Sequence, residues 1–346
     1  MKETKEAPKK INPDNYRFSV APMIDVTDTH FRFLARLLTR HTLLYTDMIT
    51  TGAILHGKRD RLLAYHNEEH PVALQLGGSD PAALQECAGW AEKYGYDEIN
   101  LNCGCPSDRV QNGAFGACLM ATPELVRDCL RAMAVNNNIP VTLKCRTGID
   151  QQDSFDDFLH FIDVATDSPC QTVIVHARNA WLKGLSPKEN REIPPLKYDW
   201  VYRLKALRPH LNIVLNGGVT SLESAKQHLQ QVDGVMMGRE AWHNTFFLAD
   251  VDAELFDAEL FNDSHVKADR ISVTRAYAAY CAEQHAQGVS LSVLTRHLLG
   301  LWHNIPGAKQ FRRHISEQSH KPGATVAIIN EALDQISHTT EVHQPP

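Results

Sequence analysis

The chain has 346 residues, of which 43% are hydrophobic and 22% are charged, a balance that allows a large folded core and excludes extensive disorder. Its 35 Lys and Arg against 41 Asp and Glu give a formal net charge of −6, which argues against a nucleic-acid partner unless basic residues gather locally. The absence of any run of about 18 apolar residues excludes a membrane-spanning helix.

The first residues of the chain, 1–16, mix Lys with Glu and Asp and contain no apolar segment. They resemble neither a signal peptide nor an acid-poor transit peptide, so we expect a solvated, disordered tail. The eight cysteines are scattered without a C-x-x-C pair, which favours reduced thiols in a long chain that has no secretion signal. We therefore expect a cytoplasmic protein.

Short β-branched or apolar runs alternate with longer helical patterns from Phe18 to about Leu248. The eight predicted strands begin at Phe18, Leu43, Val72, Glu98, Val141, Thr172, Asn212 and Gly234. Strands that alternate with helices predict βα units and a parallel sheet. Eight such units over about 230 residues favour a closed TIM barrel over an open doubly wound sheet.

Residues typical of helix N-termini lie between these predicted strands. A cap residue followed by Pro predicts helices that begin in Ser79-Asp80-Pro81 and in Thr122-Pro123-Glu124. A third helix follows Ser221, where Ser224 replaces the Glu or Gln of a capping box, so this cap is expected to be weaker.

From about Ser264 no strand pattern recurs, and the segments 270–288, 292–305 and 326–337 are predicted to be helical. The predicted fold class is α/β, a TIM (β/α)8 barrel followed by a smaller all-helical domain. The expected division of the chain is a tail over 1–16, a catalytic barrel over 17–255, a helical domain over 256–338 and a C-terminal tail over 339–346.

Several polar residues fall at the ends of predicted strands, where the active site of a TIM barrel forms. Strand interiors favour apolar side chains, so polar side chains at matching strand ends favour a functional site over structural roles. The residues at these positions are Gln75, Asn100, Asn102, Lys144, Arg146, His176, Arg178 and Asn216.

Glycines follow the last two predicted strands, in Asn216-Gly217-Gly218 and Gly238-Arg239. The phosphate site of many barrels is built from these two loops, because glycines let backbone N–H groups approach the phosphate and Arg adds a charged donor. This pattern fits flavin barrels, phosphosugar isomerases and aldolases equally well.

The segment Asn102–Ser107 places two cysteines one residue apart on a turn that Gly104 and Pro106 stiffen. The pair is too close and too isolated for a zinc site, so no metal is expected, and a disulfide between the two would be strained. One thiol acting as an acid or nucleophile is the chemical interpretation, and an inert buried cysteine is the alternative.

Beyond these local patterns, the chain resembles the tRNA-dihydrouridine synthases from about Arg17 to Arg313. The strings that carry the resemblance are APMIDVTD (21–28), ALQLGGSDP (73–81), NLNCGCPSDRVQNGAFGACLM (100–120), LKCRTGID (143–150), HARNAWLKGLSPKENREIPPL (176–196), NGGV (216–219) and MMGREA (236–241). The segment 181–196 looks like that of the subgroup that modifies positions 20 and 20a of the D-loop.

The resemblance implies that FMN is held at the barrel mouth. Pro22 and Met23 would line the flavin, Gln75 would hydrogen-bond its ring, and Lys144 would lie near its N1–C2=O side, with His176 beside it. The phosphate of FMN would be enclosed by Asn216, Gly217, Gly218, Gly238 and Arg239.

The family's acid corresponds to Cys105. In the implied cycle, NADPH reduces FMN, the reduced flavin delivers hydride to C6 of the uracil, and Cys105 protonates C5. No Rossmann fingerprint is present, so transient binding of NADPH at the flavin is expected. Two departures from the family pattern are Cys103, where a small apolar residue is more common, and Asp47, where Glu is common. We favour Cys105 over Cys103 because Gly104 and Pro106 flank it.

A local cluster of basic residues could bind RNA despite the negative net charge. Residues 293–322 carry five Lys and Arg against one acid, with four histidines interleaved. This basic helical face is expected to contact tRNA phosphates while the target base flips into the barrel. The candidate substrate contacts are Asn102, Arg178, Lys188, Arg296, Arg312 and Arg313. No stable protein partner is implied, and a monomer is expected.

Three other functions remain open from the residues alone. One is a flavin barrel that acts on a free pyrimidine, as dihydroorotate dehydrogenases do. Another is a non-catalytic RNA-binding relative. The third is a flavin-free aldolase or isomerase, in which Lys144 would form a Schiff base.

Overall fold

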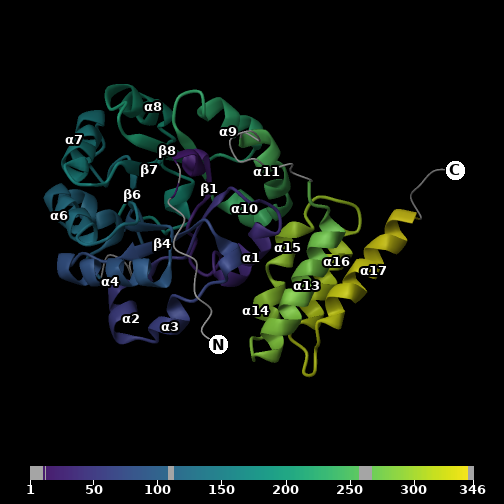
Figure 1. Ribbon diagram of the computed structural model, residues 1–346. Helices are drawn as coiled ribbons and strands as arrows, with labels where there is room; N and C mark the ends of the chain where they lie inside the picture. The colour runs from purple at the N-terminus through teal and green to yellow at the C-terminus, as the bar shows by residue number, and fades with distance from the viewer. Residues whose placement is uncertain (1–10, 12, 108–112, 257–266, 342–346) are drawn as a thin grey trace. The chain divides into compact units, whose positions relative to one another are not determined.

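The computed structural model describes residues 11, 13–107, 113–256 and 267–341. In this part of the chain, parallel strands close into a barrel, so the predicted TIM barrel is confirmed (Figure 1). β1 pairs with both β2 and β9, and β2 pairs with β4, which closes the ring. The barrel strands are β1 (Phe18–Val20), β2 (Leu43–Tyr45), β4 (Val72–Gly77), β5 (Glu98–Cys103), β6 (Val141–Arg146), β7 (Thr172–His176), β8 (Asn212–Asn216) and β9 (Gly234–Met237).

All eight predicted strands are present, and one short strand was not predicted. β3 (Ile49–Thr50) pairs with Leu76 and Gly77 of β4. Two residues are too few to show the alternation of apolar and polar side chains by which a strand is recognised in a sequence.

Helices cover the outside of the barrel (Figure 1). They are α2 (Thr51–His56), α3 (Arg59–Leu62), α4 (Pro81–Tyr94), α6 (Pro123–Met133), α7 (Phe155–Thr166), α8 (Tyr198–Leu207) and α9 (Leu222–His228). Short 3-10 helices lie at η1 (Pro13–Arg17), η2 (Asn67–Glu69), η3 (Gly116–Ala121) and η4 (Glu189–Arg191).

All three predicted helix starts are confirmed, and two of the cap residues make side-chain hydrogen bonds. Asp80 accepts from the N–H of Ala83 at 2.7 Å at the start of α4, and Ser221 accepts from the N–H of Ser224 at 3.1 Å at the start of α9. The third start is also where it was predicted, because α6 begins at Pro123 with Thr122 as its N-cap residue, but the Thr122 side chain makes no cap hydrogen bond. Its hydroxyl instead donates backward to Leu119 O at 3.4 Å, since η3 runs directly into α6.

The barrel interior has an apolar part and a polar part. Alternate strand residues point inward, and the apolar ones join Tyr16 of η1 and Ala21, which follows β1, in one buried cluster with Leu43, Tyr45, Ala73, Ile174, Val214 and Met236. On β5 and β6 the inward positions are instead polar, with Glu98, Asn100 and Thr142 almost completely buried. Polar groups at such positions require hydrogen-bond partners inside the barrel.

The described residues form two compact units. The first runs up to Thr29 and continues over Thr42–Gly238, and the second consists of His30–His41 and the part that follows from Arg239. The barrel strands all belong to the first unit. The functional division expected near residue 255 stays a prediction.

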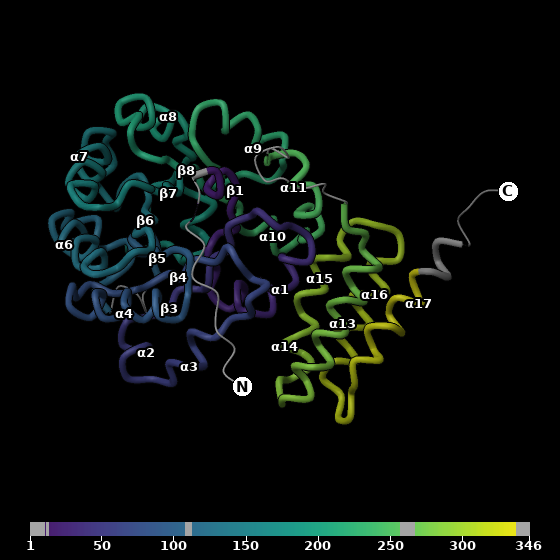
Figure 2. Tube along the Cα trace, in the orientation of Figure 1, coloured from purple at the N-terminus to yellow at the C-terminus, as the bar shows by residue number. Residues whose placement is uncertain are grey.

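The second unit is helical, as expected from the sequence. Most of α1 (Thr29–Arg36) belongs to it, together with α10 (Arg239–His243), η5 (Thr245–Phe247), α11 (Leu248–Leu255), α13 (Arg270–Ala286), α14 (Leu291–Thr295), α15 (Leu298–Leu301), α16 (Ala308–Gln318) and α17 (Ala327–Glu341). In Figure 2, α16 and α17 lie side by side, and α13 also contacts α17. In the part of the chain that is described, no helix is both long and apolar enough to span a membrane.

Two details of the predicted helices are corrected. The helix expected over 292–305 is divided into α14 and α15, because His297 turns into the unit's core and packs on the rings of Phe31 and Trp242. α17 continues to Glu341, so residues 339–341 of the expected tail are helical.

Candidate active site

The register of the strands brings the predicted polar residues to one end of the barrel. Along one row, Gln75 of β4 pairs with Asn100 of β5, which pairs with Thr142 of β6. One step nearer the mouth, Asn102 pairs with Lys144. At the rim, a third row contains Arg146, His176 and Asn216. Because parallel strands end at the same edge, these side chains surround one opening.

Cys105 lies on the turn that follows β5, and Asn102 holds the backbone of this turn. Asn102 Oδ1 accepts from the N–H groups of Gly104 at 3.1 Å and Cys105 at 3.0 Å. The carbonyl of Cys105 accepts from the N–H of Ala117 at 2.9 Å. The Cys105 side chain is partly exposed, and its Sγ lies 3.5 Å from Ser107 Oγ. A thiol on a backbone fixed at three points is well placed for proton transfer.

The two cysteines of this segment differ in environment. Cys103 ends β5 and has no exposed surface, and burial raises the pKa of its thiol well above the ordinary value. Buried, high-pKa thiols are inert. Of the two, only Cys105 is accessible from outside.

Lys144 reaches across the barrel mouth. Its Nζ donates to Asn216 Oδ1 at 3.0 Å, and Asn216 Nδ2 donates to Met236 O at 2.8 Å. Burial, with a smaller contribution from the nearby Arg146, lowers the pKa of Lys144 to about 8. Lys144 therefore still carries its charge at neutral pH, in a place where water is scarce.

His176 is a neutral imidazole. Burial and the neighbouring Arg146 and Lys144 lower its pKa well below the ordinary value. Its buried Nδ1 atom has no hydrogen-bond partner among the described residues. A buried polar atom without a partner is costly, so this nitrogen is a candidate contact for a ligand.

The glycines after β8 lie where a side chain would crowd its neighbours. Gly217 and Gly218 have φ angles of +106° and +73°, which favour glycine. A Cβ atom on Gly217 would lie 3.1 Å from His176 Nε2. A Cβ atom on Gly238 would lie 3.7 Å from Met23 Sδ, so the loop of Pro22 and Met23 lies beside Gly238. Arg239, the last of the predicted phosphate contacts, begins α10.

Arg146 has a structural task that the sequence did not reveal. It is almost completely buried and donates to three backbone carbonyls: Gly104 O at 2.8 Å, Asn179 O at 3.1 Å and Asn190 O at 2.9 Å. Burial lowers its pKa to about 10, so it remains a cation. The guanidinium thus ties the Cys105 turn to the loops after β7.

The segment after β7 is a folded loop. Asn190 is completely buried and accepts from the N–H of Trp181 at 2.7 Å, and its amide donates to Trp181 O at 2.9 Å. The guanidinium of Arg178 donates to Pro194 O, and Lys188 is exposed. No pattern of spacing marked Asn190, because its partners come together only when this loop folds.

The predicted tRNA contacts of the second unit lie on or next to short helices. Arg296 follows α14, whereas Arg312 and Arg313 lie on α16, where Arg313 is exposed and Arg312 partly buried. Two of the interleaved histidines have packing roles: His297 is buried, and His314 Nε2 pairs with Glu331 Oε2 at 3.1 Å.

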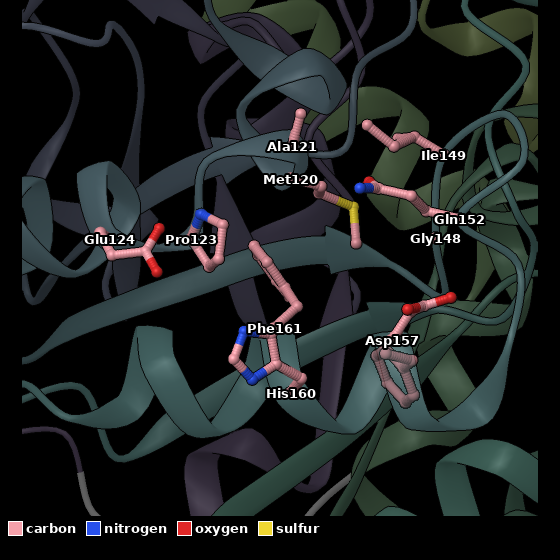
Figure 3. Close-up of a pocket in the computed structure, with 11 residues that line it drawn as sticks. Met120, Ala121, Pro123, Glu124, Gly148, Ile149, Gln152, Asp157, His160 and Phe161 are labelled. Atoms are coloured by element: carbon pink, nitrogen blue, oxygen red, sulfur yellow. The ribbon is translucent and has the colours of Figure 1, made fainter.

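A separate pocket is lined by residues of α6, α7 and the loop after β6 (Figure 3). Pro123 and Glu124 of α6 line it, together with Asp157, His160 and Phe161 of α7. Among the described residues that form its wall, none belongs to the predicted site. The predicted flavin and substrate residues therefore do not form this pocket.

Comparison with known proteins agrees with this architecture. Residues 19–338 match the family model described as dihydrouridine synthase. A protein of Escherichia coli O6:H1 named tRNA-dihydrouridine(20/20a) synthase is 58% identical over 323 residues, which is 93% of this chain and 96% of the relative. A protein of Vibrio vulnificus with the same name is 56% identical over 327 residues, 94% of this chain and 98% of the relative. The chain therefore belongs to the dihydrouridine synthase family.

Proposed function

We propose that this enzyme reduces uridine to dihydrouridine at positions 20 and 20a in the D-loop of tRNA, with FMN as cofactor and NADPH as reductant. The curated relatives that share 56–58% identity carry the name tRNA-dihydrouridine(20/20a) synthase, which supports the substrate and the positions. The observation that carries the chemistry is Cys105, a partly exposed thiol on the turn after β5, at the end of the barrel where β6 and β7 present Lys144 and His176.

Three features of the barrel mouth fit FMN. The unpartnered Nδ1 of His176 offers a polar contact, and Gln75 and Lys144 add hydrogen-bond donors that suit carbonyl oxygens of a flavin ring. Gly217, Gly218 and Gly238 follow the last two strands without side chains that would cover their backbone N–H groups, which suits a phosphate, and Arg239 follows directly. Bound FMN, reduced by NADPH, would supply the two electrons and the hydrogen that C6 of the uracil gains.

The residues of the chain then complete the reaction. Cys105 donates its proton to C5 of the ring and regains one from solvent, so the uracil gains two hydrogens in total. The cation of Lys144 stabilises negative charge that develops in the ring system. Asn102, which already positions the Cys105 turn, and Arg178 contact the nucleotide.

The second unit would hold the rest of the RNA. A protein with net charge −6 needs a local basic surface to bind phosphates, and Lys309, Arg312 and Arg313 on α16 provide one. Residues 256–338 would then serve tRNA binding and residues 17–255 catalysis, in the cytoplasm where tRNA is matured.

The function is tested with purified protein and with tRNA from cells that lack it. The protein should carry or take up FMN. When the gene is deleted, mass spectrometry of cellular tRNA should show uridine, two hydrogens lighter, in place of dihydrouridine at positions 20 and 20a. Unchanged dihydrouridine at both positions in the deletion strain, or a protein that takes up no flavin, would refute the proposal. Activity on free uridine or dihydroorotate, without activity on tRNA, would instead favour a free pyrimidine as substrate.

A further inference from the structure

Buried hydrogen bonds link the Cys105 turn to the interior of the barrel. The N–H of Cys105 donates to Asn102 Oδ1 at 3.0 Å, and Asn102 Nδ2 donates to Gln75 Oε1 at 2.8 Å. Gln75 Nε2 in turn donates to Asn100 Oδ1 at 2.8 Å. Three amide side chains from two neighbouring strands are thus connected in series.

The series ends at a buried carboxyl group. Asn100 Nδ2 donates to Thr142 Oγ1 at 2.8 Å, and the Thr142 hydroxyl donates to Glu98 Oε1 at 2.6 Å. Glu98 is completely buried. The same oxygen also accepts from the hydroxyl of Tyr45 at 2.7 Å, but this contact is a side branch that leads away from Cys105.

All the hydrogen bonds of this chain, which we call the Glu98 chain, point from Cys105 toward Glu98. The direction follows from the groups at its two ends. Backbone N–H groups only donate, so Asn102 must turn Oδ1 to the Cys105 turn and Nδ2 to Gln75. A flipped Gln75 would then bring two NH2 groups together. The last hydroxyl needs an acceptor, and Glu98 Oε1 accepts whether the carboxyl is ionised or carries its proton on Oε2.

The direction decides what the barrel mouth offers a ligand. After these bonds, Gln75 and Asn102 each keep one side-chain N–H that no described residue accepts. Both remaining groups are donors, which match the carbonyl oxygens of a flavin or a uracil ring. With the opposite direction, an acceptor oxygen would face those carbonyls and weaken binding.

We propose that Glu98 is a positioning residue for the reaction, acting as the terminal acceptor of the Glu98 chain. It completes the direction that the N–H groups of the Cys105 turn impose, in which Gln75 and Asn102 are donors toward the ligands, and through Asn102 it orders the backbone of Cys105. This inference deepens the function proposed above and rests on it for the identity of the ligands.

Two substitutions test the Glu98 chain, and each deletes one hydrogen bond to Glu98 Oε1. Thr142→Val breaks the chain, whereas Tyr45→Phe, the matched control, removes only the side branch. Glu98→Met removes the acceptor, so it makes the same break from the other side if Thr142→Val does not fold. Thr142→Ser and Glu98→Gln retain the hydroxyl and the acceptor, and they should restore wild-type behaviour.

The first readout is amide hydrogen exchange of Gly104 and Cys105 in protein freed of FMN. Exchange should become about tenfold faster in Thr142→Val and Glu98→Met, as expected when a buried hydrogen bond is lost, and remain as in wild type in Tyr45→Phe. The second readout is the dissociation constant of FMN, which should rise about tenfold in the same two variants, with a shift of the flavin absorption bands.

A purely structural role for Glu98 gives equal effects of Tyr45→Phe and Thr142→Val, and that outcome would overturn the inference. Wild-type exchange in both Thr142→Val and Glu98→Met would overturn it as well. The exchange measurement uses no flavin, so it tests the Glu98 chain even if wild-type protein takes up no FMN. A failure to take up FMN would count against the proposed function instead.

Discussion

Lys144 of β6 donates a hydrogen bond to Asn216 of β8 at 3.0 Å, passing over the intervening strand at the barrel mouth. This contact joins the predicted ring side of the flavin site to its predicted phosphate side. Burial lowers the pKa of Lys144 to about 8, so the charge that the site offers depends on pH within an accessible range.

FMN binding should therefore weaken as pH rises through about 8. Bound FMN favours the charged lysine, and the fraction of charged Lys144 in the free protein falls above this pH. The apparent dissociation constant should rise up to about tenfold by pH 9, where about one molecule in ten keeps the charge. Equilibrium titration of the protein with FMN, repeated at intervals of about 0.5 pH unit between about pH 6.5 and 9, measures this dissociation constant.

The controls separate Lys144 from general effects of pH. Lys144→Met should bind FMN more weakly and without this pH dependence. Lys205→Met removes a lysine that pairs with Asp233 and should retain the wild-type profile. An identical rise of the dissociation constant in Lys144→Met would show that another group titrates.

Cys105→Ala should keep the flavin and lose turnover. Removal of a general acid typically lowers a rate by about 10² to 10⁴. FMN absorbance and single-turnover reduction of tRNA by the reduced enzyme measure the two properties. Cys103→Ala, which removes the buried neighbouring thiol, should leave turnover unchanged, and a comparable loss in that variant would contradict the assignment of the acid to Cys105.

The sequence predicted the barrel and the ring of polar residues because both depend on local patterns. A strand end with Lys144 or His176 is recognisable from alternation and from its position before a loop. Thr122 shows the limit of this approach, since α6 begins where predicted but the local signal does not reveal that the Thr122 side chain makes no cap hydrogen bond after η3.

The tasks of Glu98, Arg146 and Asn190 depend on the folded chain. Glu98 looked like the start of a strand, and its partner Thr142 is 44 residues away. Arg146 was recognised as a residue of the barrel mouth, but its three carbonyl partners come from loops that only folding brings together. Registers and loop conformations decide such contacts, and neither is encoded in spacing.

Arg146→Lys should destabilise the protein and lower kcat, with FMN affinity little changed. A lysine cannot serve three carbonyls with the geometry of a guanidinium, and each lost hydrogen bond of a buried charged group costs about 1.5–3 kcal/mol. Chemical denaturation and steady-state kinetics with tRNA measure the effects. Arg131→Lys, at an exposed pair with Asp167, should change the free energy of unfolding by less than about 0.5 kcal/mol. Equal stability of the two variants would refute this role of Arg146.

Replacement of Arg312 and Arg313 by Glu should weaken tRNA binding without releasing FMN. Each lost phosphate contact reduces the magnitude of the slope of log K against log salt concentration by about one. Binding measured at several salt concentrations gives this slope. Arg275→Glu, at an exposed position on α13, is compared with Arg313→Glu alone, because each of these two variants changes the net charge by −2. The same loss in Arg275→Glu would indicate a nonspecific effect of charge.

Glu98 should make the stability of the protein decrease as pH rises. Burial raises its pKa from 4.5 to about 7, so the folded state binds the proton more tightly than the unfolded state does. The resulting stabilisation is fully present below pH 4.5, is lost as pH rises to about 7, and amounts to about 3 kcal/mol at 1.4 kcal/mol for each pH unit. Glu98→Gln cannot ionise, so its free energy of unfolding relative to wild type should increase over this interval and stay constant above it. Urea denaturation of both proteins at a series of pH values measures the difference, and a difference that does not vary with pH would mean that Glu98 has an ordinary pKa in the folded barrel.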